Sequence, residues 1–300
     1  MSNVSSRQSA VASERYRLSH SQNYISEPML VPKLLSHVEL GSIDTIIEIG
    51  PGKGALTFEL TQLAPQVLAI EADPKLVLAL VRRFATCHPA IIVYGDFLDF
   101  PLPARPFVVV ANIPFNRTAE IVRKLTDEQS GLQAAYLIMQ KEAAIKFSDQ
   151  SHGQASLLSY FLQLEYEVSV LCHVPRSSFS PRPRVDAAFA LFRKRKIPLL
   201  SIEEARQYKD LLSYLFPRGP LFSNALRQVF TSKQLKRLLR DLDLHNSTKL
   251  REVSFTAWLG IYQVFAEYAL PTARSKIQGS YMKLEAEQAA LHKHYRTSRH

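Results

Sequence analysis

The sequence has 300 residues, of which 46% are apolar and 10% aromatic, enough to bury an ordinary hydrophobic core and a second, smaller one. No apolar run approaches the roughly 20 residues that a membrane-spanning helix needs. The first 20 residues also lack the apolar segment of a signal peptide. The two cysteines, Cys87 and Cys172, are not spaced as a disulfide framework or a zinc site. We therefore expect a cytoplasmic protein with no bound metal.

The net charge of +10 is unevenly distributed along the chain. Residues 174–240 hold 15 Lys and Arg against 4 Asp and Glu, a surplus of +11, whereas the remaining chain holds 22 basic and 23 acidic residues. A concentration of one sign is typical of a protein that binds a polyanion. The alternative interpretation is a basic, solvated surface without a partner.

Short apolar runs alternate with helical segments from residue 43 to residue 126, and this alternation predicts a mostly parallel, Rossmann-like α/β sheet. The expected strands are 43–50, 66–73, 90–100, 106–115, 132–140, 164–174 and 185–196. The expected helices between them are 54–64, 74–85 and 118–126.

Beyond Pro198 the strand pattern disappears and helical segments follow at 201–216, 223–230, 231–242 and 254–270. Their expected N-caps are Ser201 (with Glu204 in capping-box spacing), Ser223, Thr231 and Ser254. The last helix carries apolar side chains at helical spacing, which predicts that they pack in a core: Phe255, Trp258, Leu259, Tyr262 and Phe265. We expect four parts: a flexible arm (1–20), an α/β domain that carries the candidate catalytic residues considered below (21–197), a basic helical domain suited to a polyanion (198–270) and a loose polar tail (271–300).

Three successive strands are expected to end in residues suited to a nucleoside cofactor. "EIGPGKG" places Gly50, Gly52 and Gly54 in a turn before a helix, where the backbone can approach a ligand closely. Glu71 follows at a distance that suits the ribose hydroxyls, and Asp96 can accept a hydrogen bond from an adenine amine. Because the glycine spacing departs from that of pyrophosphate-binding turns, it favours S-adenosylmethionine over a dinucleotide.

The fourth strand ends in Asn112, Ile113, Pro114 and Phe115 at the same edge. The Asn112 side-chain oxygen, with a backbone carbonyl near Ile113 or Pro114, can accept both N–H bonds of an adenine amine and aim its lone pair at a methyl donor. The Phe115 ring offers a face on which an extruded base can stack. Such catalysis depends on positioning more than on proton transfer.

These motifs resemble the ribosomal RNA adenine N6-dimethyltransferase family, over most of residues 19–260. The resemblance implies that "SQNYI" puts Gln22, Asn23 and the Ile25 backbone near S-adenosylmethionine, and that Phe179 helps to bracket the target base. It also implies that basic residues contact ribosomal RNA, for which we choose Arg182, Arg184, Arg193, Lys194, Arg195 and Lys196. We expect a monomer that transfers methyl groups to RNA.

Two branches of this family compete, and we favour the first, with macrolide-type antibiotic resistance as its implied consequence. "NIPF" and its continuation "NRTAEIVRKL" resemble the erythromycin-resistance (Erm) branch, which modifies an adenine of large-subunit RNA. "SHGQASLLSYFLQ" and "NALRQVF" are similar to the housekeeping branch, which modifies small-subunit RNA. A nucleic-acid-binding protein that has lost the chemistry, and an NAD-dependent oxidoreductase, are the less favoured alternatives.

Overall fold

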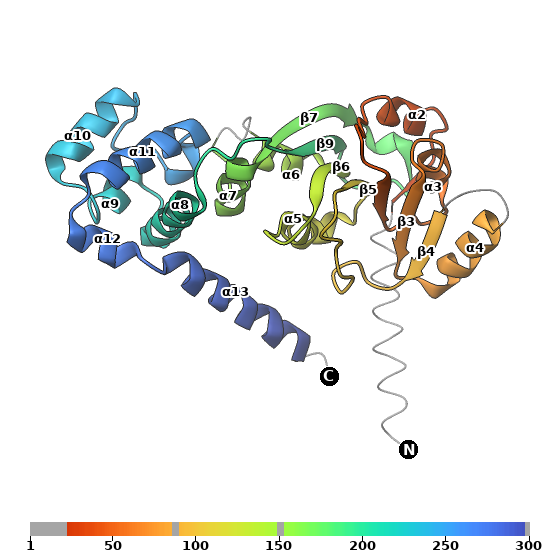
Figure 1. Ribbon diagram of the computed structural model, residues 1–300. Coiled ribbons are helices and arrows are strands. Elements are labelled where there is room, and N and C mark those ends of the chain that lie inside the picture. Colours follow the sequence, from red (N-terminus) through yellow and green to blue (C-terminus); the bar gives the residue numbers. More distant parts are fainter. Residues whose placement is uncertain (1–22, 86–89, 149–152, 298–300) are drawn as a thin grey trace, which may run out of the picture. The chain divides into compact units, whose positions relative to one another are not determined.

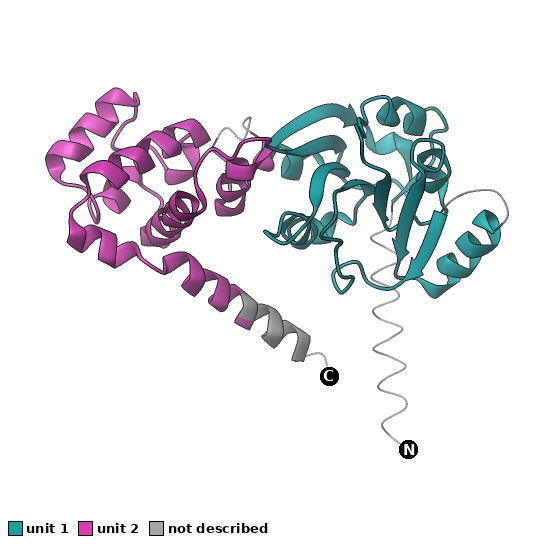
Figure 2. Cartoon of the chain, in the orientation of Figure 1, with its two compact units in different colours: residues 1–145, 167–194 teal, residues 146–166, 195–300 magenta. Residues whose placement is uncertain are grey.

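A computed structural model describes residues 23–85, 90–148 and 153–297 of the chain. The chain forms two compact units, shown in Figure 2. Unit 1 combines residues 1–145 and 167–194, and unit 2 combines residues 146–166 and 195–300. Gln22 and Cys87, which the sequence analysis singled out, lie outside the described residues.

Unit 1 contains the sheet that the sequence predicts (Figure 1). Seven of the described strands form it in the order β4-β3-β2-β5-β6-β9-β7. Strands β2 to β6 pair in parallel, and β9 runs antiparallel to β6. The strands are β2 (Thr45–Ile49), β3 (Gln66–Glu71), β4 (Ala90–Tyr94), β5 (Phe107–Asn112), β6 (Leu132–Gln140), β7 (Tyr166–Val174) and β9 (Ala187–Lys194). The expected mostly parallel, Rossmann-like sheet is confirmed.

Alternate residues of the central strands pack against helices on opposite faces of this sheet. Helices α2 (Leu30–Leu35) and α3 (Ala55–Leu60) share one core cluster with Val108, Val110 and Tyr136. Helix α5 (Thr118–Leu125) instead lies against Ala135 and Leu137, which point the other way along β6. Helix α4 (Pro74–Phe84) follows β3 and begins at an Asp73 cap, as the proline in its first turn predicts.

A second, two-stranded pairing joins the start of unit 1 to a segment late in its sequence. Strand β1 (Tyr24–Ile25) pairs antiparallel with β8 (Phe179–Ser180), and the Ser26 N–H donates to the Ser178 carbonyl at 2.9 Å. The chain between these two strands forms most of the sheet. The pairing therefore brings the "SQNYI" segment beside the loop that precedes β9.

Unit 2 is helical, as the sequence predicts for the region beyond Pro198. Its elements after α6 (Lys141–Phe147), which crosses the boundary between the units, are α7 (Leu157–Glu165), α8 (Ile202–Leu215), η3 (Phe216–Arg218), α9 (Phe222–Leu226), α10 (Ser232–Asp241), η4 (Leu250–Glu252), α11 (Phe255–Tyr268), α12 (Pro271–Ile277) and α13 (Ser280–Thr297). Trp258, Tyr262 and Phe265 of α11 are buried in one cluster, and Phe255 and Leu259 pack against it. The predicted core face of this helix is therefore confirmed.

Three of the four predicted helix caps are present in unit 2. Ser201 and Thr231 each form a capping box, and the Ser254 side chain accepts the Ala257 N–H. The prediction for Ser223 was wrong. Helix α9 begins one residue earlier, and the Ser223 hydroxyl donates instead to the Asn246 carbonyl at 2.9 Å.

The structure divides the chain differently from the expected four parts. Residues 146–166, expected in the catalytic domain, belong to the helical unit, where Tyr160 of α7 joins the core cluster. The expected loose tail forms α12 and α13 up to Thr297. The start of α13 is held by Asp210 of α8. The buried Asp210 carboxylate accepts the N–H groups of Gly279 at 3.0 Å and Tyr281 at 2.8 Å.

Candidate functional site

The glycine turn after β2 adopts a backbone that excludes larger side chains. Gly52 has φ of +58°, and a Cβ placed there would lie 2.7 Å from the Tyr24 ring. Gly54 is the N-cap of α3 with φ of +78°, in the left-handed region that glycine tolerates best. The Gly50 N–H donates to the Ile70 carbonyl at 2.9 Å, which joins this turn to β3. The turn thus forms a cradle of backbone, covered on one side by the Tyr24 ring.

Glu71 ends β3 with its carboxylate directed at this turn. Its Oε2 accepts the Gly52 N–H at 3.0 Å and its Oε1 accepts the Asp73 N–H at 2.9 Å. Burial raises the pKa of Glu71, while the hydrogen bonds from Asp73 and Gly52 oppose that increase. Two of the residues selected from the sequence, Gly52 and Glu71, are therefore in direct contact.

Glu48 is a candidate site residue that the sequence analysis passed over. Its side chain is buried, with 1% of the residue exposed, and no group among the described residues donates to its Oε2 atom. Burial raises the pKa of Glu48 to about 8, the Thr57 hydroxyl opposes this, and the charge of Glu71 adds to it. Its place in "EIGPGKG" was visible in the sequence, but its unpaired, buried state was not. A buried carboxyl oxygen without a donor is typical of a functional site.

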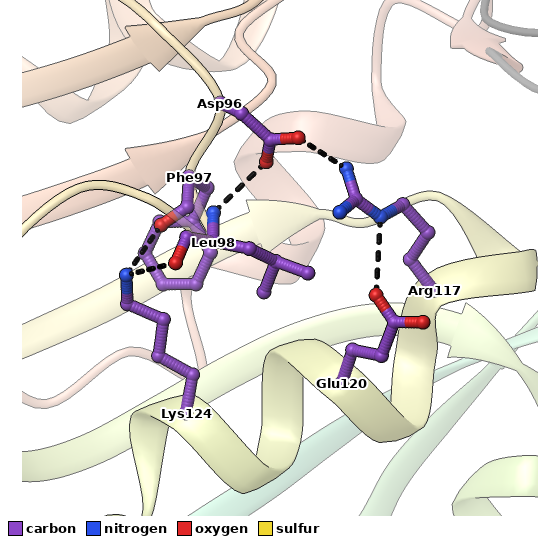
Figure 3. A network of polar contacts seen from close by, with 6 residues as sticks. All are labelled: Asp96, Phe97, Leu98, Arg117, Glu120 and Lys124. Carbon is purple, nitrogen blue, oxygen red and sulfur yellow. Dashed lines mark hydrogen bonds and ion pairs between the residues drawn. The ribbon is translucent and has the colours of Figure 1, made fainter. Parts of the chain in front are cut away.

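Asp96 lies just beyond the end of β4 in a polar network, drawn in Figure 3. Its Oδ1 accepts the Leu98 N–H at 2.9 Å, and its Oδ2 pairs with Nη1 of Arg117 at 2.7 Å. Burial alone would lower the pKa of Arg117, but the hydrogen bond to Asp96 and the nearby charges raise it. Sequence reasoning missed this arginine, because nothing local to it indicates a partner 21 residues earlier.

The amide of Asn112, at the end of β5, has a defined orientation. Its Nδ2 donates to the backbone carbonyl of Asn23 at 2.7 Å. This bond uses the donor end of the amide and leaves Oδ1 as the acceptor. The Asn23 segment and the "NIPF" loop, which the sequence separates by 89 residues, are thereby brought together.

The rest of the "NIPF" loop consists of a buried residue, a turn and a half-buried ring. Ile113 is buried, and its N–H donates to the Ile138 carbonyl at 3.1 Å. The Pro114 carbonyl accepts the Arg117 N–H at 3.0 Å in the turn η1 (Phe115–Arg117). The Phe115 ring is partly buried against the core cluster of α2 and α3. Of the two backbone carbonyls considered from the sequence, that of Ile113 is therefore the better acceptor for a substrate amine.

Phe179 does not have the exposure that the sequence analysis expected. Only 3% of the residue is exposed, because its pairing with Ile25 directs the ring into the core cluster. A buried ring has no face to offer a base in this conformation. Ile25 itself is partly buried beside it, so its backbone serves the β1–β8 pairing.

The six basic residues selected from the sequence differ in their exposure and in their partners within the protein. Arg182, Arg184 and Lys196 are exposed. Arg193 is also exposed but pairs with Glu39 at 2.8 Å, and the partly buried Arg195 donates to the Gln163 carbonyl at 3.1 Å. Lys194 is partly buried at the end of β9. The "RKRK" segment is therefore partly structural, because two of its four side chains bind groups of the protein itself.

Comparison with known proteins identifies the family to which this arrangement belongs. Residues 13–267 match the family described as "Ribosomal RNA adenine dimethylase". The chain belongs to this family. It is an S-adenosylmethionine-dependent rRNA adenine N6-methyltransferase.

Relatives of both branches resemble this family member. An rRNA adenine N-6-methyltransferase of Bacillus licheniformis is 30% identical over 83% of this chain and 87% of its own length. Ribosomal RNA small subunit methyltransferase A of Nostoc punctiforme is 31% identical over 72% of this chain and 81% of its own length. Among solved structures, the 23S rRNA methyltransferase ErmE has a TM-score of 0.75 and 26% identity, over 82% of this chain and 100% of ErmE.

The residues of this methyltransferase suit S-adenosylmethionine. The Tyr24 ring packs against Gly52, whereas a Cβ at Gly50 would meet nothing within 4 Å among the described residues, so a ligand can approach the peptide closely at Gly50. The Oε2 of Glu48 has no donor among the described residues, and the carboxylates at the ends of β3 and β4 have further acceptor capacity, as hydrogen bonds from an amino group, ribose hydroxyls or an adenine amine would require. Within the described parts of the chain, no helix is long and apolar enough to cross a membrane.

Proposed function

We propose that this protein methylates the N6 amine of one adenine in large-subunit (23S-type) ribosomal RNA, and so confers macrolide-type resistance. The observation that carries the chemistry is the Asn112 amide, whose donor end is bound to Asn23 and whose oxygen is left to accept. The choice of RNA is supported by the similarity to ErmE and by Ile113 and Phe115 in the "NIPF" sequence. The bound cofactor supplies an electrophilic methyl group on a sulfonium.

The residues of the loop have separate duties in this proposal. Asn112 Oδ1 and the Ile113 carbonyl accept the two N–H bonds of the target amine, which directs the nitrogen lone pair toward the methyl group. The partly exposed Phe115 ring stacks on the base. Positioning of this kind can remove a large part of a reaction barrier, because the reacting atoms meet already aligned.

RNA affinity is assigned to exposed basic side chains. Arg182 and Arg184 are exposed in unit 1, and Lys233 and Lys236 are exposed on α10 of unit 2. Contacts with phosphates supply affinity without sequence information. The identity of the target adenine is then set by RNA shape and by the extruded base.

A second candidate substrate is the small-subunit (16S-type) ribosomal RNA. It is favoured by the similarity to small subunit methyltransferase A of Nostoc punctiforme. Both candidates use the same site and chemistry, so an assay of the RNA product distinguishes them.

The test is primer extension on unmodified 23S and 16S RNA after incubation with enzyme and S-adenosylmethionine. We expect a new stop at one adenine of 23S RNA and none in 16S RNA. The Asn112→Ala variant should abolish the stop while retaining RNA binding, because the lost bonds matter most when the amine is aligned for attack. A stop in 16S RNA alone would establish the second candidate, and methylation of neither RNA would refute both.

A further inference from the structure

The loop that follows β4, residues 95–100, is held by two side chains that follow the "NIPF" sequence. Lys124 of α5 donates to the carbonyls of Phe97 and Leu98, each at 2.8 Å, and to that of Phe100. Arg117 binds the Asp96 carboxylate at 2.7 Å. Figure 3 shows both side chains reaching this loop. The lysine therefore restrains the backbone of the loop, and the arginine restrains its carboxylate.

Arg117 is itself fixed at three points. Its backbone N–H donates to the Pro114 carbonyl at 3.0 Å, its Nε lies 3.5 Å from Oε2 of Glu120, and its Nη1 binds Asp96. The two charged side chains remain partly accessible, with 27% of the Arg117 side chain and 36% of the Asp96 side chain exposed. The ion pair thus lies at a surface that a ligand can reach.

We propose that Arg117 is a positioning residue that sets the preference for an adenine-containing cofactor, by orienting the Asp96 carboxylate toward the adenine amine. This inference rests on the proposed adenine contact of Asp96. A carboxylate only accepts hydrogen bonds, so it favours adenine, which donates from its amine, over hypoxanthine, which presents a carbonyl oxygen at the same place. Charge-assisted bonds to a guanidinium are directional and fix the plane of the carboxylate.

The contacts of Lys124 make it possible to distinguish a positioning role of Arg117 from a structural role. Because Lys124 holds three carbonyls of the loop independently, removal of the Arg117 side chain leaves the loop backbone restrained. The Asp96 carboxylate also keeps its bond from the Leu98 N–H. Removal of the Arg117 side chain should therefore reduce ligand selectivity and leave folding largely intact.

The test is calorimetric titration of the full chain with S-adenosylhomocysteine and with S-inosylhomocysteine, which carries hypoxanthine. We expect wild type to bind the adenosyl ligand more tightly than the inosyl ligand. Arg117→Met should weaken binding of the adenosyl ligand about tenfold and leave the affinity for the inosyl ligand nearly unchanged. Arg117→Lys should recover part of the preference. Arg123→Met is the matched control, because Arg123 is an exposed arginine of α5, the helix that follows Arg117 directly.

A double-variant comparison identifies the route through which Arg117 acts. In an Asp96→Asn background, Arg117→Met should cause little further loss of adenosyl affinity, because its partner is already altered. Unchanged selectivity in Arg117→Met, or equal weakening of both ligands together with a lower melting temperature, would overturn the proposal. Equal affinity of wild type for both ligands would also overturn it. These titrations contain no RNA, so their outcome is independent of which RNA is methylated.

Discussion

Replacement of the buried Glu48 by glutamine should change how stability depends on pH. Folding raises the pKa of this carboxyl from an ordinary value of 4.5 to about 8. Below pH 4.5 both the folded and the unfolded chain hold the proton, and the carboxyl has little effect on stability. Between pH 4.5 and about 8 the unfolded chain has lost the proton and the folded chain retains it, so stability falls as the pH rises.

The size of the effect follows from the pKa difference of about 3.5 between the two states. At about 1.36 kcal/mol for each pH unit, Glu48 lowers the free energy of unfolding by about 5 kcal/mol above pH 8. Glutamine has nearly the same shape and does not titrate. Glu48→Gln should therefore match wild type near pH 4.5 and become progressively more stable than wild type up to pH 8.

The assay is urea unfolding of the cofactor-free protein at intervals from pH 5 to pH 9, with the difference between the two proteins plotted against pH. Only the difference is interpreted, because groups that are not coupled to Glu48 titrate equally in both chains. A difference that stays constant across this range would refute the reasoning, since it would mean that Glu48 ionises normally in the folded state.

Four further predictions concern the base, the RNA backbone, the Arg195 side chain and the C-terminal helix. Phe115→Ala should lower methylation severely, because it removes the roughly 1 to 3 kcal/mol of stacking on one base, whereas Phe115→Tyr should retain much of the activity. Full methylation by a stable Phe115→Leu variant would contradict stacking. Replacing Arg182 and Arg184 with Ala should reduce the slope of log affinity against log salt by about two units, and an unchanged slope would mark them as solvent-facing charges only. By contrast, Arg195→Ala should lower the melting temperature, because Arg195 binds the Gln163 carbonyl. Asp210→Ala removes two bonds to backbone N–H groups and should increase hydrogen exchange over residues 280–288. The control is Asp241→Ala, which removes an exposed carboxylate of α10. Unchanged exchange in Asp210→Ala would show that α13 is held by other contacts.

The sheet and the backbone of the site could be predicted from the sequence. Strands buried on both faces read as continuous apolar runs, and polar or glycine residues interrupt them where they end. Strand β6 was predicted to the residue, and the predicted β3 ended two residues too late. The predicted β5 began one residue early and continued through the "NIPF" loop to residue 115, whereas the strand ends at residue 112. Because parallel strands end at one edge, Gly50, Glu71, Asp96 and Asn112 could be assigned to a single site before the fold was known.

Helix boundaries were less predictable where a polar segment depends on a distant partner. Residues 271–297 have the composition of a loose tail, yet Asp210, 69 positions before Gly279, binds the start of α13. The helix α7 was not anticipated either, and its Tyr160 packs in the cluster of unit 2. Local periodicity contains no information about such contacts, because they depend on which segments fold beside each other.

The sequence by itself determined the family, the sheet and the four strand ends proposed as the site, because each depends on residue types at short spacing. Only the tertiary structure decided how the side chains there are used. The orientation of the Asn112 amide depends on a carbonyl 89 residues away, and Phe179 is buried because β1 pairs with β8. Likewise, Glu48 is unpaired and Asp96 is bound to Arg117 only because the strands are packed as they are. Burial and partners set the charge and direction of a polar group, and both are properties of the packed chain.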